Sequence, residues 1–336
     1  MMKSILSKLA LTAGLCVALA MPSSASAAEI KVGFSPSLPQ IPLYIAAEKG
    51  FFKEEGLDVS LKPTVTATPK LLPLLAGGEL DIVFGGASAA LFNAMDGGIK
   101  FAMVADGGQV DPNFDGSPYV IIVRKDLYDA GSFKTLADLK GKTLSFAVEG
   151  TSLAYMMFKA LKNAGLQPSD VTIRYFKALS DMGVAFQNKA VDASAMTVPL
   201  NLGLAKNGIS VDWVDARQAA PGLQAYTLIY GEKLLTSRRE EGKAFLRAYA
   251  KAIAWYKNAL KGDKSELIQI GAKWTKLPVE TLQNSIWTYF DDKLQMNVPD
   301  IKDQYQTWLE QKLVKGGLDV DSFIDTKLAS EALQSK

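Results

Sequence analysis

The feature that most constrains the fold is a change of pattern along the chain. Between residues 30 and 230, short apolar runs alternate with helical patterns, and after Arg239 only helical patterns continue. Such alternation predicts strands joined by crossover helices, and therefore mostly parallel α/β sheets. The predicted strands are Ile30–Phe34, Asp58–Leu61, Asp81–Phe84, Lys100–Ala105, Tyr119–Val123, Thr143–Val148, Val171–Phe176, Ala193–Thr197 and Ala225–Tyr230.

One helix can be predicted in detail. Apolar residues recur at the spacing of a single helical face at Leu153, Met156, Met157, Ala160, Leu161 and Ala164. Thr151 or Ser152 can cap its start, and Gly165 can end it. We interpret the methionine pair as core packing. The helices after Arg239 are expected to pack on an already formed sheet domain, with most of their tryptophans as packing residues.

Two turn signals predict that the chain crosses twice between two lobes. Ser117-Pro118 and Pro221-Gly222 each lead into a predicted strand. Lobe one would comprise residues 28–118 and 232–336, and lobe two would comprise residues 119–231 including the hinge strands. The length is sufficient for two lobes that each have a hydrophobic core.

The first 27 residues have the pattern of a secretory signal peptide. Lys3 and Lys8 form a basic start, residues 9–21 are apolar, and Ala25-Ser26-Ala27 supplies small residues at the cleavage spacing. The apolar run is shorter than the roughly 20 residues that span a bilayer, so a retained anchor is only the alternative. We therefore expect cleavage near Ala27 and a periplasmic location.

Cleavage would also remove Cys16, the only cysteine. The mature chain would then have neither disulfides nor a thiol nucleophile. Lipid attachment at Cys16 is the alternative, although the preceding Leu15 is larger than the residue usual at such sites. The cut leaves 35 Lys and Arg against 35 Asp and Glu. This neutral balance gives no reason to expect binding to nucleic acid or to an anionic membrane surface.

The absence of histidine excludes several kinds of chemistry. Without histidine there is no Ser-His-Asp triad, no Cys-His pair and no histidine-based zinc site. There is also no GxxxxGKS/T loop and no GxGxxG after a strand, so we expect no nucleotide, no other cofactor and no metal. Acid–base catalysis by carboxylates alone stays open, but no spaced carboxylate pair stands out.

A different element recurs three times: a strand that ends in small, hydroxylic or glycine-rich residues just before a helix. It occurs at residues 31–40, 81–92 and 144–158. In open α/β sheets, ligands bind beyond the carboxyl ends of the strands, where helix N-termini offer unpaired amides and partial positive charge. The residues predicted to bind a ligand there are Ser37, Gln40, Gly86, Ala87, Ser88, Glu149, Gly150, Thr151, Ser152 and Thr197.

The turns at residues 85–88 and 149–152 would belong to different lobes, so they can face each other across a cleft that closes on a solute. Each hydroxyl also has a simpler interpretation, because Ser and Thr at such positions commonly cap helices. Gln40 lies ahead of Pro42 and is either a cleft residue or an exposed cap. Thr197 is either a ligand contact or part of a turn.

Glu149 complicates the picture of an anion site. A carboxylate beside the pocket would repel a purely anionic solute. Either Glu149 points away from the cleft, or the solute also carries an amine or a ring N–H donor. Both alternatives stay open.

The chain resembles the periplasmic solute-binding proteins of the nitrate/sulfonate/taurine type, which are related to thiamine-pyrimidine binders. The most specific segment is KVGFSPSLPQIPLYIAAEKGFFKEEGLDVSL at residues 31–61, and residues 77–98 and 136–166 resemble the later blocks. The likeness covers nearly all of residues 29–330. It implies an α/β, type II periplasmic-binding-protein fold with two mixed-sheet lobes, two hinge crossings and C-terminal helices.

The resemblance also implies where a ligand would bind: the loop around Gln40 and the turns at residues 86–88 and 150–152. Many sulfonate and nitrate binders have a histidine or a basic residue near the second turn, whereas Leu153-Ala154-Tyr155 follows Ser152 here. This departure keeps a zwitterion or a heteroaromatic ring open as ligand, with Tyr155 or Tyr226 as stacking residue.

The implied function is an extracytoplasmic receptor that passes a small sulfonate, nitrate or related organic solute to an ABC permease and its ATPase. The receptor would act as a monomer. The alternatives are a receptor for a thiamine pyrimidine or another heteroaromatic solute, a secreted enzyme of the same fold, and a sensor that docks to a membrane receptor. A pyrimidine-synthesising enzyme of the yeast type is disfavoured, because its chemistry relies on histidine.

Overall fold

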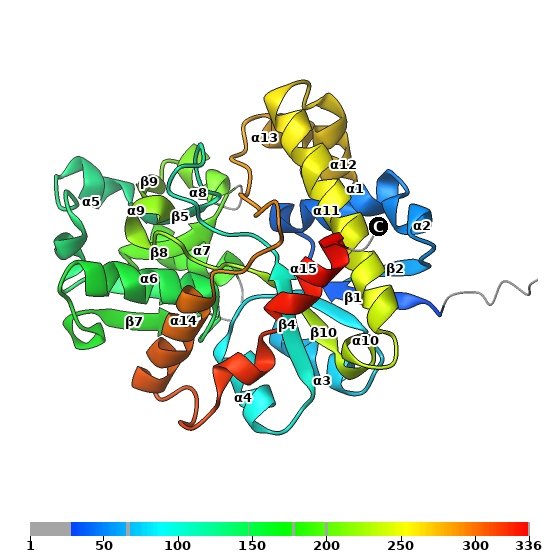
Figure 1. Ribbon diagram of the computed structural model, residues 1–336. Helices are drawn as coiled ribbons and strands as arrows, with labels where there is room; N and C mark the ends of the chain where they lie inside the picture. Colours follow the sequence, from blue (N-terminus) through cyan, green and yellow to red (C-terminus); the bar gives the residue numbers. More distant parts are fainter. Residues whose placement is uncertain (1–27, 65–67, 147, 177–178, 199–200, 335–336) are drawn as a thin grey trace, which may run out of the picture.

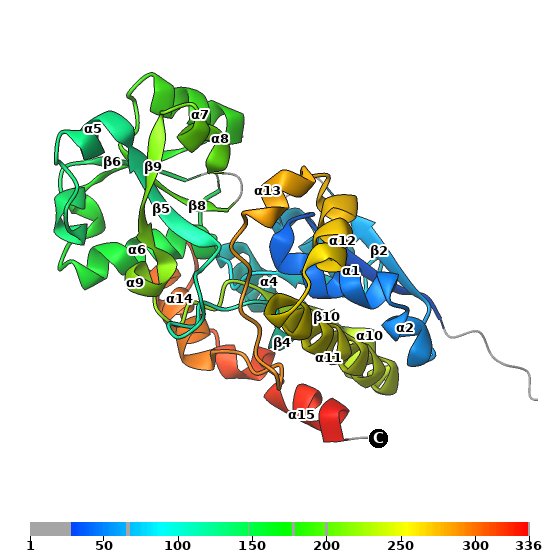
Figure 2. The ribbon, with the colours of Figure 1, turned by 90° about the horizontal axis from the view of Figure 1, so that it is seen from above.

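The computed structural model describes residues 28–64, 68–146, 148–176, 179–198 and 201–334. Two five-stranded sheets form two lobes that lie side by side (Figures 1 and 2). Helices flank each sheet, and each sheet contains both parallel and antiparallel pairs. The predicted class, α/β with two mixed-sheet lobes, is confirmed.

The first sheet has the order β2-β1-β3-β10-β4. Its strands are β1 (Ile30–Phe34), β2 (Val59–Pro63), β3 (Ile82–Gly85), β4 (Phe101–Asp106) and β10 (Thr227–Gly231). β1 is parallel to β2 and β3, whereas β10 runs antiparallel to β3 and β4. β10 follows the whole second sheet in sequence, so the chain returns to complete the first one.

The second sheet has the order β7-β6-β8-β5-β9. Its strands are β5 (Tyr119–Arg124), β6 (Thr143–Phe146), β7 (Thr172–Tyr175), β8 (Ala193–Thr197) and β9 (Ser210–Asp215). All nine predicted strands have a counterpart in the two sheets, with ends shifted by a few residues. β9 was not predicted, because its short run is interrupted by Asp212. It lies at the sheet edge and pairs antiparallel with β5.

The helices surround these sheets. The second lobe carries α5 (Lys125–Asp129), α6 (Ser152–Asn163), α7 (Leu179–Gln187), α8 (Leu202–Lys206) and α9 (Ala216–Ala219). The rest of the chain carries α1 (Ile41–Glu48), α2 (Phe51–Glu54), α3 (Leu72–Ala76), α4 (Ala89–Asp96), α10 (Glu232–Leu235), α11 (Arg239–Lys261), α12 (Ser265–Thr275), α13 (Val279–Gln283), α14 (Val298–Glu310) and α15 (Thr326–Gln334). None of the helices in the described residues has both the length and the apolar character needed to span a bilayer.

Helix α6 and the C-terminal helices pack as their apolar spacing predicts. Met156 and Met157 are fully buried, as expected for core packing. Thr151 caps α6, since its Oγ1 accepts a hydrogen bond from the Ala154 amide. The long helix α11 buries one face, which includes Phe245 and Tyr249, against the first lobe.

Two antiparallel segments carry the chain between the lobes. They contact each other where the Val110 amide donates to the Leu223 carbonyl and the Ala225 amide donates to the Gly108 carbonyl. The exact domain boundaries stay a prediction, but one feature of the packing differs from a simple two-lobe division. α14 follows the first-lobe helices in sequence and nevertheless packs on α6 of the second lobe, as well as on α4.

Candidate functional site

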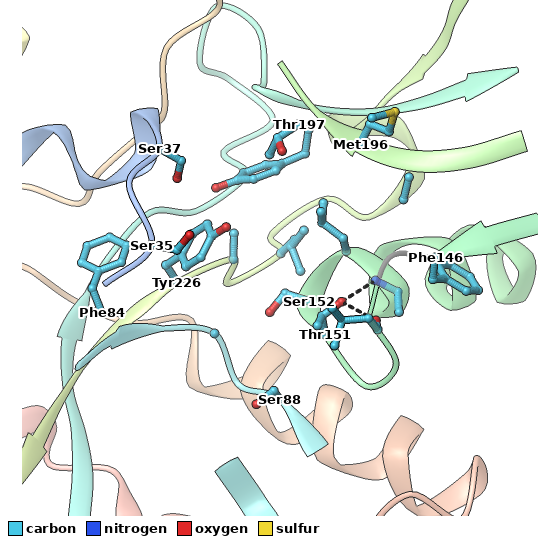
Figure 3. A pocket seen from close by; sticks show the side chains of 18 of the residues that line it. Ser35, Ser37, Phe84, Ser88, Phe146, Thr151, Ser152, Met196, Thr197 and Tyr226 are labelled. Carbon is cyan, nitrogen blue, oxygen red and sulfur yellow. Dashed lines mark hydrogen bonds between the residues drawn. The ribbon is translucent and has the colours of Figure 1, made fainter. Parts of the chain in front are cut away.

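A pocket of about 350 Å³ lies between the two lobes (Figure 3). Its wall combines the segments after β1 and β3 with the segments after β6 and β8, at the edge where ligands bind in open α/β sheets. The polar residues that line it are all uncharged: Ser35, Ser37, Gln40, Ser88, Tyr119, Thr151, Ser152, Thr197 and Tyr226. No Asp, Glu, Lys or Arg is found among the described residues of the wall.

The loop after β1 presents an amide to the pocket. The Ser37 hydroxyl donates to Gln40 Oε1 over 2.5 Å, and the Tyr44 hydroxyl donates to the Ser37 carbonyl over 3.1 Å. Tyr44 is itself fixed by stacking on Trp274. Gln40 is only 2% exposed, and its Nε2 donates to no described residue. The Gln40 amide nitrogen is therefore the end available to a ligand.

The turn after β3 is held by contacts that cap α4. Ser88 Oγ accepts a hydrogen bond from the Leu91 amide over 3.2 Å, which leaves the hydroxyl proton free to be donated. The first amide of α4, at Ala89, donates to the Gly150 carbonyl of the second lobe over 2.9 Å. This amide is occupied by protein and cannot serve a ligand.

The start of α6 is different, because two of its backbone amides have no partner among the described residues. Thr151 Oγ1 accepts from the Ala154 amide and donates to the Val148 carbonyl, so this hydroxyl is satisfied. Within the described part of the chain, the amides of Ser152 and Leu153 donate no hydrogen bond. Two free N–H groups at the N-terminus of a 12-residue helix can bind an oxygen atom of a solute.

The two glycine turns lie directly against each other. A Cβ atom added to Gly86 would come within 2.5 Å of Ser152 Oγ and 2.8 Å of the Ala225 carbonyl oxygen. Gly150 has a φ of +67°, and a Cβ there would come within 2.6 Å of Ala89 Cβ. Glycine is therefore required at both positions for the lobes to approach this closely.

Aromatic and aliphatic side chains form the rest of the wall. The ring of Tyr226 lies beside that of Phe84, with the centroids 5.4 Å apart (Figure 3). The centroid of the Tyr119 ring lies 6.5 Å from that of Tyr226. Burial raises the pKa of Tyr226 and of Tyr119 above the ordinary value of a phenol, so both hydroxyls stay protonated. The pocket therefore offers neutral donors beside flat apolar surfaces.

The structure brings eight of the predicted residues to this pocket: Ser37, Gln40, Gly86, Ser88, Thr151, Ser152, Thr197 and Tyr226. Three predicted residues do not line it. The Ala87 carbonyl accepts from Trp308 Nε1, the Gly150 carbonyl accepts from Ala89, and the exposed Glu149 interacts with Tyr175. Ligand contact by any of these residues stays a prediction.

Tyr155, considered as a stacking residue, lies elsewhere. Its hydroxyl lies within hydrogen-bond distance of Asp300 and Asp303 on α14, and its side chain is fully buried outside the pocket wall. Several wall residues were not predicted, including Phe84, Tyr119, Phe146 and Met196. Each lies in a predicted strand, where an apolar side chain gives no signal that separates pocket wall from core.

The chain matches the family described as NMT1/THI5 like over residues 39–259. YtlA of Bacillus subtilis (strain 168) is 24% identical over 233 residues, which is 68% of this chain and 66% of YtlA. The 4-amino-5-hydroxymethyl-2-methylpyrimidine phosphate synthase THI11 of Saccharomyces cerevisiae is 26% identical over 142 residues, 42% of this chain and 38% of the synthase. The chain thus spans less than two thirds of the length of either relative.

Solved structures resemble the fold over almost the whole chain. The alkanesulfonate-binding protein SsuA from Xanthomonas axonopodis pv. citri, bound to MOPS, superposes with a TM-score of 0.69 at 19% identity, covering 90% of this chain and 99% of SsuA. The periplasmic nitrate-binding protein NrtA from Synechocystis PCC 6803 gives a TM-score of 0.71 at 19% identity, covering 92% of this chain and 89% of NrtA. These likenesses confirm the predicted periplasmic-binding-protein fold. The family match over residues 39–259 shows that the chain belongs to the NMT1/THI5-like family.

Proposed function

We propose that this protein is the exported receptor of an ABC importer and that it captures a small, uncharged organic solute with a flat ring between its lobes. The observation that carries the proposal is the pocket wall. Both lobes contribute to it, and its described residues offer hydroxyls, an amide and aromatic rings without any charged side chain. A pocket of this kind binds through apolar contact and a few placed hydrogen bonds.

The family and the fold support a receptor. Structural neighbours include an alkanesulfonate-binding and a nitrate-binding protein, whose names describe capture rather than turnover. Delivery to a permease and its ATPase, action as a monomer and a periplasmic location complete the proposal. The predicted signal peptide, residues 1–27, lies outside the described residues.

A sulfonate or nitrate is the second candidate ligand, and a specific observation favours it. The free amides of Ser152 and Leu153 at the start of α6 can bind an anionic oxygen without help from a cation. A neutral solute with a carbonyl or ring nitrogen acceptor would use the same two amides. The neutral solute is favoured because burying a full charge here would lack a charged partner among the described wall residues.

A synthase is the alternative class, since yeast relatives carry synthase names. The chain has no histidine, and its only cysteine lies within the predicted signal peptide. The described pocket wall contains no carboxylate and no amine that could act as acid or base, and burial keeps the phenols of Tyr119 and Tyr226 protonated. A receptor is therefore the better supported function.

The test is thermal unfolding of the mature protein with 4-amino-2-methylpyrimidine, nicotinamide, taurine, methanesulfonate and nitrate. Saturating ligand raises the free energy of unfolding by about 2.7 kcal/mol at 100 times its Kd. We expect the melting temperature to rise with the neutral rings. A rise with the sulfonates or nitrate alone would favour the second candidate. No rise with any compound, or consumption of one, would count against a receptor.

A matched pair of variants locates the site. Tyr226→Phe removes a hydroxyl of the pocket wall, while Tyr128→Phe removes an exposed hydroxyl on α5. Loss of one neutral hydrogen bond is worth on the order of 1 kcal/mol, or about fivefold in affinity. Tyr226→Phe should weaken binding by this amount and Tyr128→Phe should not. Equal affinities would place the ligand elsewhere.

A further inference from the structure

Helix α14 contacts both lobes and the segments that connect them. It begins beside the crossing segments, where the Asn297 amide donates to Gln224 Oε1 over 2.7 Å. Near its end, the buried Trp308 donates to the Ala87 carbonyl of the first lobe and meets Tyr155 and Phe158 of the second lobe edge-on. One helix thus contacts both lobes and the connection between them.

The centre of this contact is a hydroxyl held between two carboxylates. Tyr155 Oη on α6 lies 2.8 Å from Asp300 Oδ1 and 2.7 Å from Asp303 Oδ2, both on α14. Burial and the two carboxylates raise the pKa of Tyr155 well above its ordinary value, so the phenol keeps its proton. One phenolic proton can serve only one of two acceptors. The second short contact requires another proton.

The surroundings show where that proton belongs. Asp303 forms an ion pair with Lys159, and although burial opposes it, hydrogen bonds from Lys159 and Tyr155 hold the pKa of Asp303 below its usual value. Asp303 is therefore ionised and accepts from Tyr155. Asp300 is 8% exposed, and burial raises its pKa. Among the described residues a lysine pairs with Asp303 and no cation pairs with Asp300, so we assign the extra proton to Asp300.

The position of the proton within Asp300 follows from its other contacts. Oδ2 accepts from the Gln224 amide over 2.8 Å and from Gln304 Nε2 over 2.9 Å. Oδ1 is the remaining oxygen, and it faces Tyr155. The three side chains therefore form a chain of two hydrogen bonds. Asp300 Oδ1–H donates to Tyr155 Oη, and Tyr155 O–H donates to Asp303 Oδ2.

We propose that α14 is a strap that holds the second lobe against the first, and that the shared-proton chain Asp300–Tyr155–Asp303 is its pH-sensitive fastening. Loss of the Asp300 proton leaves two oxygen lone pairs facing each other between Asp300 and Tyr155, which weakens the α14–α6 contact. The strap is thus tightest at low pH and loosens as pH rises through the pKa of folded Asp300. The proposal does not depend on the identity of the solute.

The strap also reaches the pocket. Gln304 Nε2 donates to the Gln224 carbonyl and to Asp300, which are both acceptors, so Gln304 Oε1 must be the atom that faces Ser152 Oγ at 3.2 Å. Ser152 lines the pocket on the side of the second lobe. Release of α14 would therefore free the pocket-side turn at the start of α6 together with the lobe.

Three other groups could influence the fastening. Lys159 and Lys162 of α6 both face Asp303, at the far end of the chain from Asp300. Asp106 lies beyond the Gln224 side chain, whose Nε2 donates to it. The charge of Lys159 also lowers the pKa of Asp300, against the larger effect of burial, whereas Asp106 reaches Asp300 only through Gln224. Asp300 is the group whose titration changes the Tyr155 contact.

The experiment measures the distance between the lobes with no ligand present. Cys16 is the only natural cysteine, so spin labels on cysteines at Lys53 of α2 and at Ala130, just after α5, would be the only labels on the mature chain. Both positions are exposed. Distance distributions between the two labels are recorded by pulsed electron resonance at pH 5 and at pH 9.

Two variants give opposite expectations. Asp300→Asn keeps a donor toward Tyr155 and an acceptor for Gln224 but cannot lose a proton, so its distribution should be narrow at both pH values. Tyr155→Phe removes the hydroxyl at the middle of the hydrogen-bond chain and keeps the aromatic ring. The distance distribution of this variant should therefore be broad at both pH values. The wild type should change from narrow at pH 5 to broader and longer at pH 9.

Tyr128→Phe on the same lobe is the control and should follow the wild type. Circular dichroism establishes that each variant is folded. If Tyr155→Phe is unfolded, Asp303→Ala replaces it with the same expectation, because alanine removes the acceptor of the Tyr155 proton. A wild-type distribution that does not change with pH would overturn the proposal. So would an Asp300→Asn distribution that broadens with pH as the wild type does, or a narrow one for Tyr155→Phe.

Discussion

The close approach of the two lobes depends on Gly86, and a single methyl group tests it. An alanine Cβ at this position would lie 2.5 Å from Ser152 Oγ and 2.8 Å from the Ala225 carbonyl oxygen, where ordinary contacts begin at 3.4 Å. Ser152 can rotate away if it gives up its hydrogen bond to Gln304. The Ala225 carbonyl belongs to the backbone, and the amide of the same residue donates to the Gly108 carbonyl, so this segment cannot move freely.

This overlap determines how much Gly86→Ala lowers the free energy of unfolding. Forcing a methyl group into a packed region costs about 1–3 kcal/mol. Gly86 is not among the glycines with positive φ, so alanine is compatible with its backbone, and restriction of the unfolded chain returns about 0.4–1 kcal/mol. We expect Gly86→Ala to lower the free energy of unfolding by about 1.3 kcal/mol, the difference of the midpoints of these two ranges.

The assay is urea unfolding followed by tryptophan fluorescence and circular dichroism. Gly203→Ala is the matched control, because Gly203 lies in α8 and no atom of the described residues comes within 4 Å of the added Cβ. That substitution should stabilise the protein by about 0.5–1 kcal/mol. If Gly86→Ala were as stable as Gly203→Ala, the two turns would not be packed against each other as described, and the pocket would not be closed at this point.

Three further predictions concern stability. Thr151→Ala removes the cap that accepts from Ala154 and should cost about 0.5–2 kcal/mol in urea unfolding, whereas Thr151→Ser should retain most of it. Trp308→Ala empties a fully buried interlobe site and should cost about 3–5 kcal/mol by the same measurement, and a smaller loss would mean that the site collapses. Burial raises the pKa of Asp106 from 3.8 to about 6, so the wild type should lose stability as the pH rises from about 4 to 6, and Asp106→Asn should not show this decline; parallel pH profiles would contradict it.

The sequence was sufficient for the fold because its signals are local and repeated. Alternating apolar runs identified nine of the ten strands in the described residues, and the spacing of Leu153, Met156 and Met157 identified α6 with its cap. The turns at Gly86 and Gly150 were recognised because glycine between the end of a strand and the start of a helix is typical of a tight turn. Their side-by-side position followed once the residues were assigned to different lobes.

The chemistry of the pocket wall was harder to predict. The Thr151 hydroxyl makes its hydrogen bonds within the start of α6, whereas Tyr226 lines the pocket. The sequence does not show which hydroxyls are used by the protein itself and which can reach a ligand. Phe84 and Tyr119 come from strands and were indistinguishable from core residues. The neutrality of the wall is a property of the assembled pocket, since it depends on which charged side chains stay outside.

Helix α14 shows why the sequence does not predict the contacts of a buried polar face. Asp300, Asp303 and Gln304 lie three and four residues apart, a spacing that places them on one helical face and that ordinarily marks a face exposed to water. In the structure this polar face is turned toward α6 and the crossing segments, where Tyr155 and Gln224 satisfy it. An amphipathic pattern distinguishes the polar face from the apolar one but does not show what the polar face meets. Buried polar contacts between distant helices are therefore the part of this protein that only the three-dimensional arrangement reveals, and they connect α14 to the pocket through Gln304 and Ser152.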